Sequence, residues 1–247
     1  MRNVRRRAAI AVLAAALAAA CGGGPPGVEG DGRPLRVLIT NDDGIEAPGI
    51  AALAEALRAL GEVTVVAPAK NSTGASHGVT SDRPIAVRRS ERRGQAWWAV
   101  DALPATCVRL GVEELLPARP DLVVSGINRG ENLGTVTFYS ATVGAAREAA
   151  FLGIPALAVN LVTDDGADFG EAAAVTLSIV RALGRKGVPP GTLLNVNIPA
   201  LPREELRGLR ITRQDTRAPV DFFEKSVSPE GGTSYAPGWA HLEPEAE

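Results

Sequence analysis

The sequence predicts an α/β fold in which a mostly parallel sheet carries helices on both faces, as in doubly wound proteins. Short apolar, β-branched runs alternate along the chain with stretches in which apolar residues recur at helical spacing. Helices of ten or more residues between strands provide the long crossovers that parallel pairing requires. The 247 residues, 45% of them hydrophobic, are enough for one large core and exclude a disordered chain.

The first half of this alternation begins with LRVLIT at Leu35–Thr40, a short apolar run that predicts a buried strand. The next stretch, 49–60, spaces Ile50, Leu53 and Leu57 as one face of a helix does, and Gly61 ends it. The same reasoning predicts a strand at 62–67, an antiparallel pair at 84–88 and 97–100 with charged residues 88–93 at its tip, and a helix at 105–116.

The second half continues the pattern without an internal repeat. The predicted elements are a strand at 121–125, a helix at 141–152, a strand at 156–160, a helix at 167–184 and a strand at 193–198. Successive strand–helix–strand units of this kind predict one layered sheet.

The first twenty residues have the pattern of an export signal. Four arginines precede the uncharged run 8–20, which is too short to span a bilayer, and small residues lead to Cys21. A cysteine at this point is typical of a bacterial lipoprotein, with its thiol lipidated; the alternative is an ordinary secretory signal in which Cys21 is incidental. The Gly/Pro-rich tether at 21–33 favours the lipoprotein. We therefore expect an exported, periplasmic or cell-envelope protein that meets the membrane only through its lipid anchor.

Charge and cysteine content exclude further classes. A net charge of −2 without a basic patch argues against a nucleic acid duplex as partner. Two cysteines cannot form a disulfide-dense scaffold or a four-thiolate zinc site. Cys107 is expected to be a buried apolar residue.

Three of the predicted strands run directly into polar loops. These are Asn-Asp-Asp-Gly at 41–44, Asn-Ser-Thr-Gly-Ala-Ser-His at 71–77, and Gly-Ile-Asn-Arg-Gly-Glu-Asn-Leu-Gly at 126–134. Parallel pairing places the carboxyl ends of these strands on one edge of the sheet, where ligands bind in open α/β folds. We therefore expect the three loops to form one site.

The adjacent carboxylates of Asp42 and Asp43 indicate a cation at this edge. Two neighbouring carboxylates repel each other, and a divalent cation relieves that repulsion. Oxygen ligands favour Mg²⁺ or Mn²⁺, with Ca²⁺ as a further candidate, over zinc. The alternative for this segment is a solvated turn before Gly44; the two other polar loops favour the cation.

The third loop and the helix after it indicate a phosphate site. Its glycines allow backbone N–H groups to approach a ligand, and Asn128 and Asn132 add neutral amides. Ser140 is placed to begin the helix, with Thr142 in its first turn, so hydroxyls and free N–H groups meet there. The alternative is a plain strand-to-helix connection. Phosphate beside a cation predicts ester hydrolysis by a metal-activated water, with His77 either near the site or simply a polar loop residue.

Three long segments in this order resemble the SurE (survival protein E) family of 5′/3′-nucleotidases: LITNDDGIEAPGI, VVAPAKNSTGASHGVT and PDLVVSGINRGENLGTVTFYSATVGAAREAAFLGIPALAVN. The resemblance runs from about Leu35 to Arg217. It implies a Rossmann-like three-layer core, one divalent cation, and dephosphorylation of nucleoside monophosphates, often with some activity on short polyphosphate.

The resemblance also implies a role for individual residues. The family's metal ligands would fall on Asp42, Asp43, Thr73 and Asn128, with the two aspartates as the catalytic residues. Its phosphate contacts would fall on Asn132, Ser140 and Thr142, with Gly74 beside them.

The chain also departs from the family pattern. Thr73 stands where the family usually has Ser, and Ala141 where it has Gly. The family's GTPxDCV segment appears as Ala-Leu-Pro-Ala-Thr-Cys-Val at 102–108, which loses the Gly-Thr pair and the Asp. The domain would then cover 34–213, followed by a shortened C-terminal extension at 214–247 that argues against the family's standard homodimer.

The resulting hypothesis is a metal-dependent phosphomonoesterase that hydrolyses nucleoside 5′-monophosphates, and 3′-monophosphates as a further substrate. The alternative is a nucleotide- or phosphate-binding lipoprotein of the same fold with lost or weak turnover. A structural lipoprotein with a decayed site is a third reading, and it would bind neither metal nor nucleotide.

Overall fold

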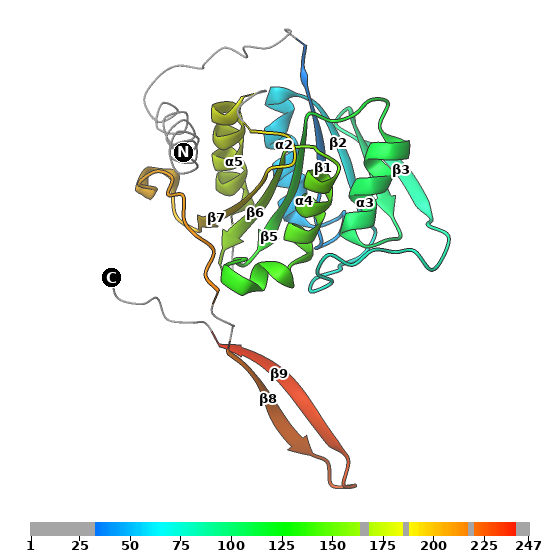
Figure 1. The fold of residues 1–247 in the computed structure, drawn as a ribbon, viewed down its shortest axis with the longest axis vertical. Helices are drawn as coiled ribbons and strands as arrows, with labels where there is room; N and C mark the ends of the chain where they lie inside the picture. Colours follow the sequence, from blue (N-terminus) through cyan, green and yellow to red (C-terminus); the bar gives the residue numbers. More distant parts are fainter. Residues whose placement is uncertain (1–32, 164–167, 185–187, 217–219, 241–247) are drawn as a thin grey trace, which may run out of the picture.

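The computed structural model describes residues 33–163, 168–184, 188–216 and 220–240. Within them, a seven-stranded sheet in the order β3-β4-β2-β1-β5-β6-β7 carries helices on both faces (Figure 1). Every neighbouring pair is parallel except β3 with β4. The predicted three-layer α/β fold with a mostly parallel sheet is confirmed. The export signal, Cys21 and most of the tether lie outside the described residues.

The elements follow the predicted alternation closely. In chain order they are β1 (Leu35–Thr40), α2 (Pro48–Leu57), the 3₁₀ turn η1 (Arg58–Leu60), β2 (Gly61–Pro68), β3 (Val87–Arg92), β4 (Gln95–Val100), α3 (Pro104–Leu110), the π-helical turn η2 (Gly111–Leu115), β5 (Leu122–Arg129), the 3₁₀ turn η3 (Gly134–Phe138), α4 (Ala141–Phe151), β6 (Ala156–Val162), α5 (Phe169–Leu183), β7 (Leu193–Pro199), the 3₁₀ turn η4 (Arg203–Glu205), β8 (Val220–Val227) and β9 (Thr233–Ala240).

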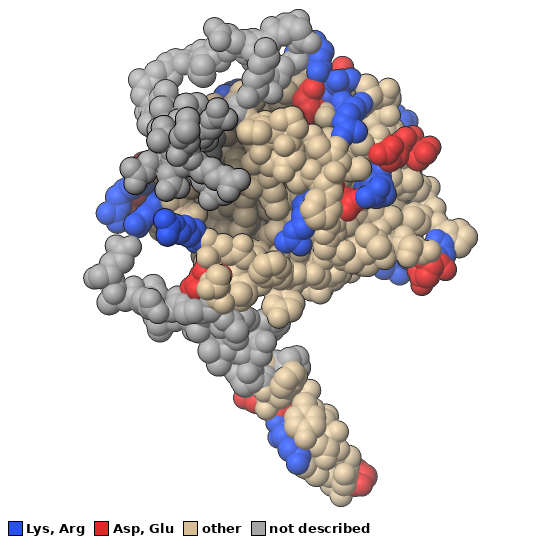
Figure 2. Space-filling model, viewed as in Figure 1, with Lys and Arg blue, Asp and Glu red and all other residues tan. Residues whose placement is uncertain are grey.

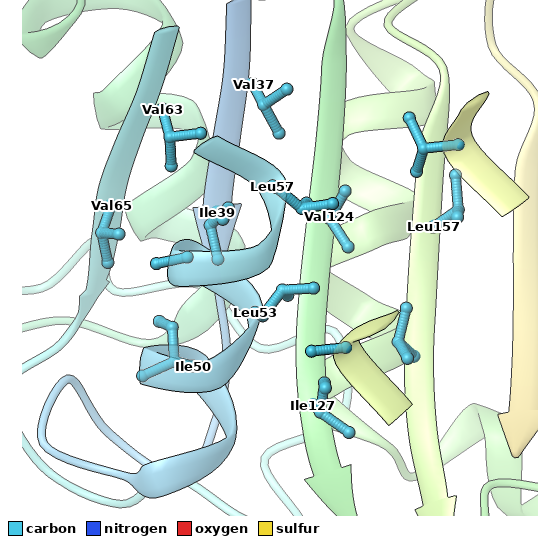
Figure 3. Close-up of a cluster of buried hydrophobic side chains, with 14 of the residues drawn as sticks. Val37, Ile39, Ile50, Leu53, Leu57, Val63, Val65, Val124, Ile127 and Leu157 are labelled. Carbon is cyan, nitrogen blue, oxygen red and sulfur yellow. The ribbon is translucent and has the colours of Figure 1, made fainter. Parts of the chain in front are cut away.

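One core lies between the sheet and the layer of α2 and α5. Ile50, Leu53 and Leu57 of α2 point toward the valines and isoleucines of β1, β2 and β5, such as Ile39 and Val124 (Figure 3). All five side chains are fully buried. Burying one such side chain stabilises the fold by about 1.5–3 kcal/mol. This face therefore anchors β1, whose carboxyl end carries the predicted aspartates.

The second core lies under α3 and α4 on the opposite face. α4 is rich in small residues and is buried along most of its length. Gly144 lies against the loop at 71–78, and a Cβ built on it would stand 2.4 Å from the Ser76 carbonyl oxygen. A helix made of larger residues could not approach that loop so closely. The composition of α4 thus brings its first turns to the carboxyl edge of the sheet.

The structure corrects two predicted boundaries. The charged run predicted as a hairpin tip is the edge strand β3, and the turn is at Arg93 and Gly94. The guanidinium carbon of Arg92 lies 4.4 Å from the ring centre of Trp97, and that of Arg89 lies 5.6 Å from the ring centre of Trp98, so both arginines contact tryptophans of β4. The third core strand continues beyond Ser125, because β5 resumes pairing with β6 after a bulge and reaches Arg129.

The C-terminal extension contains a second, two-stranded antiparallel sheet, β8–β9, which stands apart from the main body (Figure 1). It exposes Phe223, Val227 and Tyr235. On the body, the face shown in Figure 2 intersperses both signs of charge without a continuous basic patch. No helix among the described residues is long and apolar enough to cross a membrane.

Candidate functional site

The three predicted polar loops meet at the carboxyl ends of β1, β2 and β5. The Ser72 N–H donates to the Asp42 carbonyl oxygen at 2.7 Å, which ties the second loop to the first. The Ser76 N–H donates to the Tyr139 carbonyl oxygen at 3.0 Å, and the Ser76 hydroxyl donates to the Phe138 carbonyl. These bonds join the second loop to the segment just before α4. The predicted convergence of sequence-distant loops is confirmed.

Asp42 is the most deeply buried carboxylate of the site, with 2% of its surface exposed. The Thr142 hydroxyl, from the first turn of α4, donates to its Oδ1 at 2.5 Å. Burial raises the pKa of Asp42 above its ordinary value, and the Thr142 bond opposes that rise only in part. The structure therefore assigns the Thr142 hydroxyl to the Asp42 carboxylate, which also accepts backbone hydrogen bonds from Asp42 and Thr142.

Asp43 is half-buried beside Asp42. Its pKa is raised to about 6, first by burial and then by the neighbouring Asp42 charge, while Arg129 lowers it. Two carboxylates with raised pKa values hold negative charge at an energetic cost that a bound cation would remove.

Thr73 and Asn128 are the other two predicted ligands. Thr73 is exposed on the second loop, whose turn is closed by its N–H donating to Asn71 Oδ1 at 2.7 Å. Gly74, also exposed, follows with a φ of +77°, which favours glycine. Asn128 is half-buried at the end of β5 and donates from Nδ2 to the Gly130 carbonyl at 2.9 Å. That bond orients the amide, so Oδ1 is the atom free to serve as an acceptor.

Buried polar atoms without partners surround the same strand ends. Among the described residues, Thr40 Oγ1, Asn41 Oδ1 and Ser125 Oγ are fully buried and lack a hydrogen-bond partner. Thr40 and Ser125 are neighbours in register on β1 and β5. An unsatisfied buried polar atom costs about 1–3 kcal/mol. Natural folds concentrate such atoms where a ligand, ion or water completes them.

The N-terminus of α4 contacts the end of β1 through the bond from Thr142 to Asp42. Ser140 is its N-cap, and the Ser140 hydroxyl accepts from the Val143 N–H at 3.1 Å. The first turn of a helix presents N–H groups with no partner inside the helix, and its dipole attracts anions. Ser140, Thr142 and Asp42 thus place an anion-attracting helix end beside a cation-attracting carboxylate.

His77 lies on the flank of α4. Its Nε2 is 2.8 Å from Oε2 of the buried Glu148, whose other oxygen accepts from Arg109. The His77 ring also packs against Phe151 at 5.4 Å. These contacts show that His77 fastens the second loop to α4.

The altered segment at 102–108 supports the far end of the same loop. The Thr80 N–H donates to Thr106 Oγ1 at 2.8 Å, and the Leu103 N–H donates to Thr80 Oγ1 at 3.0 Å. The loop is therefore held although the family's Gly-Thr pair and Asp are absent. Cys107 is fully buried, as expected, and burial raises the pKa of its thiol.

Sequence reasoning missed three asparagines that bind Asn132. Asn160 of β6 and Asn195 and Asn197 of β7 contact its backbone and side chain. Asn132 itself is buried, and its amide donates to Asn160. The signal was present as Asn-Val-Asn at 195–197, an unusual polar alternation within an apolar strand.

The donor set fits a hard divalent cation. Two carboxylates, a hydroxyl and an amide oxygen are the ligands that Mg²⁺ or Mn²⁺ accepts. Within the described residues no group of three or more His, Cys, Asp or Glu side chains is arranged to hold a metal. Among the described residues this excludes a metal site made of cysteine and histidine side chains. It does not concern a site that combines carboxylate, hydroxyl and amide oxygens, such as the one predicted here.

Comparisons with known proteins agree with this geometry. The family model described as Survival protein SurE matches residues 37–221. The chain is 46% identical over 209 residues to the 5′-nucleotidase SurE of Geotalea uraniireducens, a match that covers 84% of this chain and 83% of that protein. It is 47% identical over 202 residues to the 5′-nucleotidase SurE of Pelobacter propionicus, covering 81% of each.

Among solved structures, the crystal structure of the SurE protein from Aquifex aeolicus is similar, with a TM-score of 0.74 and 41% sequence identity. The match covers 84% of this chain and 85% of that chain.

Proposed function

Because the chain belongs to the SurE family, we propose that it is a metal-dependent phosphomonoesterase that hydrolyses nucleoside 5′-monophosphates, and 3′-monophosphates as well, to nucleoside and phosphate. The two relatives named above are 5′-nucleotidases by name and are nearly half identical to this chain. The single observation that carries the proposal is the bond between Thr142 of the α4 N-terminus and the buried Asp42 carboxylate. It sets a phosphate-attracting helix end against a cation-attracting carboxylate.

Asp42, Asp43, Thr73 and Asn128 would hold one divalent cation, Mg²⁺ or Mn²⁺. The raised pKa values of both aspartates support this, since a cation would stabilise the charges that burial disfavours. When bound, the cation would activate a water molecule and offset charge on the phosphate. The contribution of Thr142 is to fix the Asp42 carboxylate in one orientation.

The phosphate would bind at the N-terminus of α4, among Ser140, Thr142, Gly74 and Asn132. Ser140 caps the Val143 N–H and so keeps the first turn of the helix, with the positive end of its dipole, in place. The Ser76 bonds hold the second loop against the same helix end. Together these contacts orient the ester and limit its motion, which is how positioned sites lower a barrier.

The test is phosphate release from AMP and from 3′-AMP with Mn²⁺ or Mg²⁺ present, compared with Asp42→Asn and Asp43→Asn. Each substitution should reduce phosphate release by at least about 100-fold, because it removes a charged group that no neighbour replaces. Calorimetry distinguishes the enzyme from the alternative, a nucleotide-binding protein without turnover. Metal-dependent AMP binding without phosphate release would identify that binding protein.

We also propose that the protein is exported and anchored through a lipid on Cys21, on the strength of the leader and tether sequences alone. Fractionation of cells that express the full chain tests this. Unsubstituted protein should sediment with membranes and Cys21→Ser should not; equal partitioning of both would refute the anchor.

A further inference from the structure

The asparagines of β6 and β7 form one connected hydrogen-bond network. Asn160 donates from Nδ2 to Asn195 Oδ1 at 2.8 Å and to the Val196 carbonyl at 2.9 Å. Asn160 also stands opposite Asn197 in the parallel register of the two strands. Alternation places Asn195 and Asn197 on the same face of β7. The three side chains therefore share the α4 face of the sheet, at its carboxyl edge.

This network holds Asn132 at four points. Asn197 Oδ1 accepts the Asn132 backbone N–H at 2.9 Å, and Asn160 Oδ1 accepts its side-chain Nδ2 at 2.6 Å. The Asn132 carbonyl accepts from Asn195 Nδ2 at 2.7 Å and from Asn197 Nδ2 at 3.3 Å. Both the backbone and the side chain of one loop residue are thus fixed to two strands.

The held residue lies in the loop that connects the two halves of the candidate site. Upstream, Asn128 pairs with Asn160 across the β5–β6 ladder, and the Gly130 N–H donates to the Leu161 carbonyl at 2.8 Å. Downstream, the chain runs through η3 to Ser140 at the start of α4. Fixing Asn132 therefore fixes the segment between a predicted metal ligand and the predicted phosphate site.

Asn160 carries a cost that packing alone does not explain. It is fully buried on the interior strand β6, where an amide without partners is unfavourable and an apolar side chain would fill the space at no such cost. Asn197 is half-buried and Asn195 is exposed on the edge strand β7, where their oxygens accept hydrogen bonds from the buried residues Asn132 and Asn160. Here every amide of the network makes hydrogen bonds to another member or to backbone. Hydrogen bonds that satisfy every buried member of such a network rigidify those members and select one arrangement.

We propose that Asn160, Asn195 and Asn197 are positioning residues for phosphate binding, which act by holding Asn132 and its loop against the α4 N-terminus; this inference rests on the proposed function of the site. None of the three is assigned a contact with substrate. Loosening the loop should weaken phosphate-ester binding while the cation ligands stay in place.

The experiment measures, for the full chain, the KM for AMP, the inhibition constant and calorimetric affinity of inorganic phosphate, and the affinity for Mn²⁺. Asn160→Ala should raise the KM and weaken phosphate affinity roughly tenfold, the equivalent of about one hydrogen bond. Its Mn²⁺ affinity should change much less than its phosphate affinity, because the Asn160 side chain bonds to Asn132, Asn195 and Val196 rather than to the side chain of the predicted ligand Asn128.

Two matched variants separate positioning from stability. Asn197→Asp keeps an oxygen that can accept the Asn132 N–H, whereas Asn197→Leu keeps the volume and removes the acceptor. The Asp variant should retain phosphate affinity better than the Leu variant. Thr176→Val is the control, because Thr176 is fully buried and its hydroxyl donates only within α5, to the Ala172 carbonyl. It should lower Tm without changing KM.

Network variants that lower Tm but keep the KM and phosphate affinity of the unsubstituted protein would overturn the inference. Network variants whose ratio of phosphate affinity to Mn²⁺ affinity equals that of the unsubstituted protein would also overturn it. So would an unsubstituted protein that binds no phosphate. Failure of the proposed function would give a different result. The unsubstituted protein would then release no phosphate from AMP, while it still bound phosphate and the network variants still weakened that binding.

Discussion

Replacing Asp43 by Asn should stabilise the metal-free protein while it removes activity. The pKa of Asp43 is raised from 3.8 to about 6, chiefly by burial. At pH 8 folding therefore buries an ionised carboxylate at a cost. Asn has nearly the same shape as Asp but carries no charge, so it avoids that cost. At pH 4 the carboxyl is protonated in the folded state and partly protonated in the unfolded state, so the difference between the two proteins should be much smaller there than at pH 8.

The magnitude follows from the shift. About two pKa units correspond to roughly 3 kcal/mol at 1.36 kcal/mol per unit. Asp43 is only half-buried, and solvent screening reduces that value to about 1–2 kcal/mol. For a chain of this size the gain corresponds to a Tm increase of about 2–8 °C.

The pH dependence of stability that Asp43 causes is opposite to the one that a salt-bridged carboxylate causes. The folded state holds its proton more tightly than the unfolded state, so stability falls as pH rises from about 4 to about 6. Adding Mn²⁺ should invert the order of the two proteins. At 100 times its Kd, the cation stabilises the unsubstituted protein by about 2.7 kcal/mol, and the Asn variant gains less because it has lost a ligand.

The assay is thermal unfolding of both proteins at pH 4, 6 and 8, with chelator and with Mn²⁺. Asp82→Asn is the matched control, because it removes an equal charge from an exposed position. A variant that is no more stable than the unsubstituted protein at pH 8 in chelator would refute the reasoning. A difference that does not depend on pH would refute it equally.

Three further outcomes are expected. Ser140→Ala should cost about 1 kcal/mol of stability, because the Val143 N–H loses its cap, and should weaken phosphate affinity in calorimetry. Gly144→Ala should destabilise by about 1–3 kcal/mol and reduce phosphate release, since the new Cβ would displace the loop at Ser76; normal activity and Tm would contradict that packing. With limiting Mn²⁺, kcat/KM should fall as pH drops through about 6, where Asp43 takes up a proton, and the midpoint should move lower at higher Mn²⁺.

Local pattern was sufficient for the layers of the fold. The apolar run Leu35–Thr40 and the helical spacing of Ile50, Leu53 and Leu57 follow from burial on one face, which a sequence displays directly. The edge strand β3 was misplaced because its stability depends on a partner strand. Its arginines contact tryptophans of β4, and such contacts are invisible in a window of neighbouring residues.

The candidate site was predictable to the extent that topology decides it. Parallel strands had to bring the loops after β1, β2 and β5 to one edge. The partner of each side chain was not predictable: the Thr142 hydroxyl binds Asp42, His77 binds Glu148, and Asn132 is held from β6 and β7. Each of these bonds joins residues that are far apart in sequence, so only the packed structure reveals them.

The most direct test of the proposed chemistry is phosphate release from AMP by the purified protein with Mn²⁺, with excess chelator, and with Asp42→Asn. The predicted result is release that depends on the cation, stops in chelator, and is lost in the variant although its fold is intact. Release that continues at full rate in chelator, or in the Asp42→Asn protein, would contradict a cation held by the carboxylates at the end of β1.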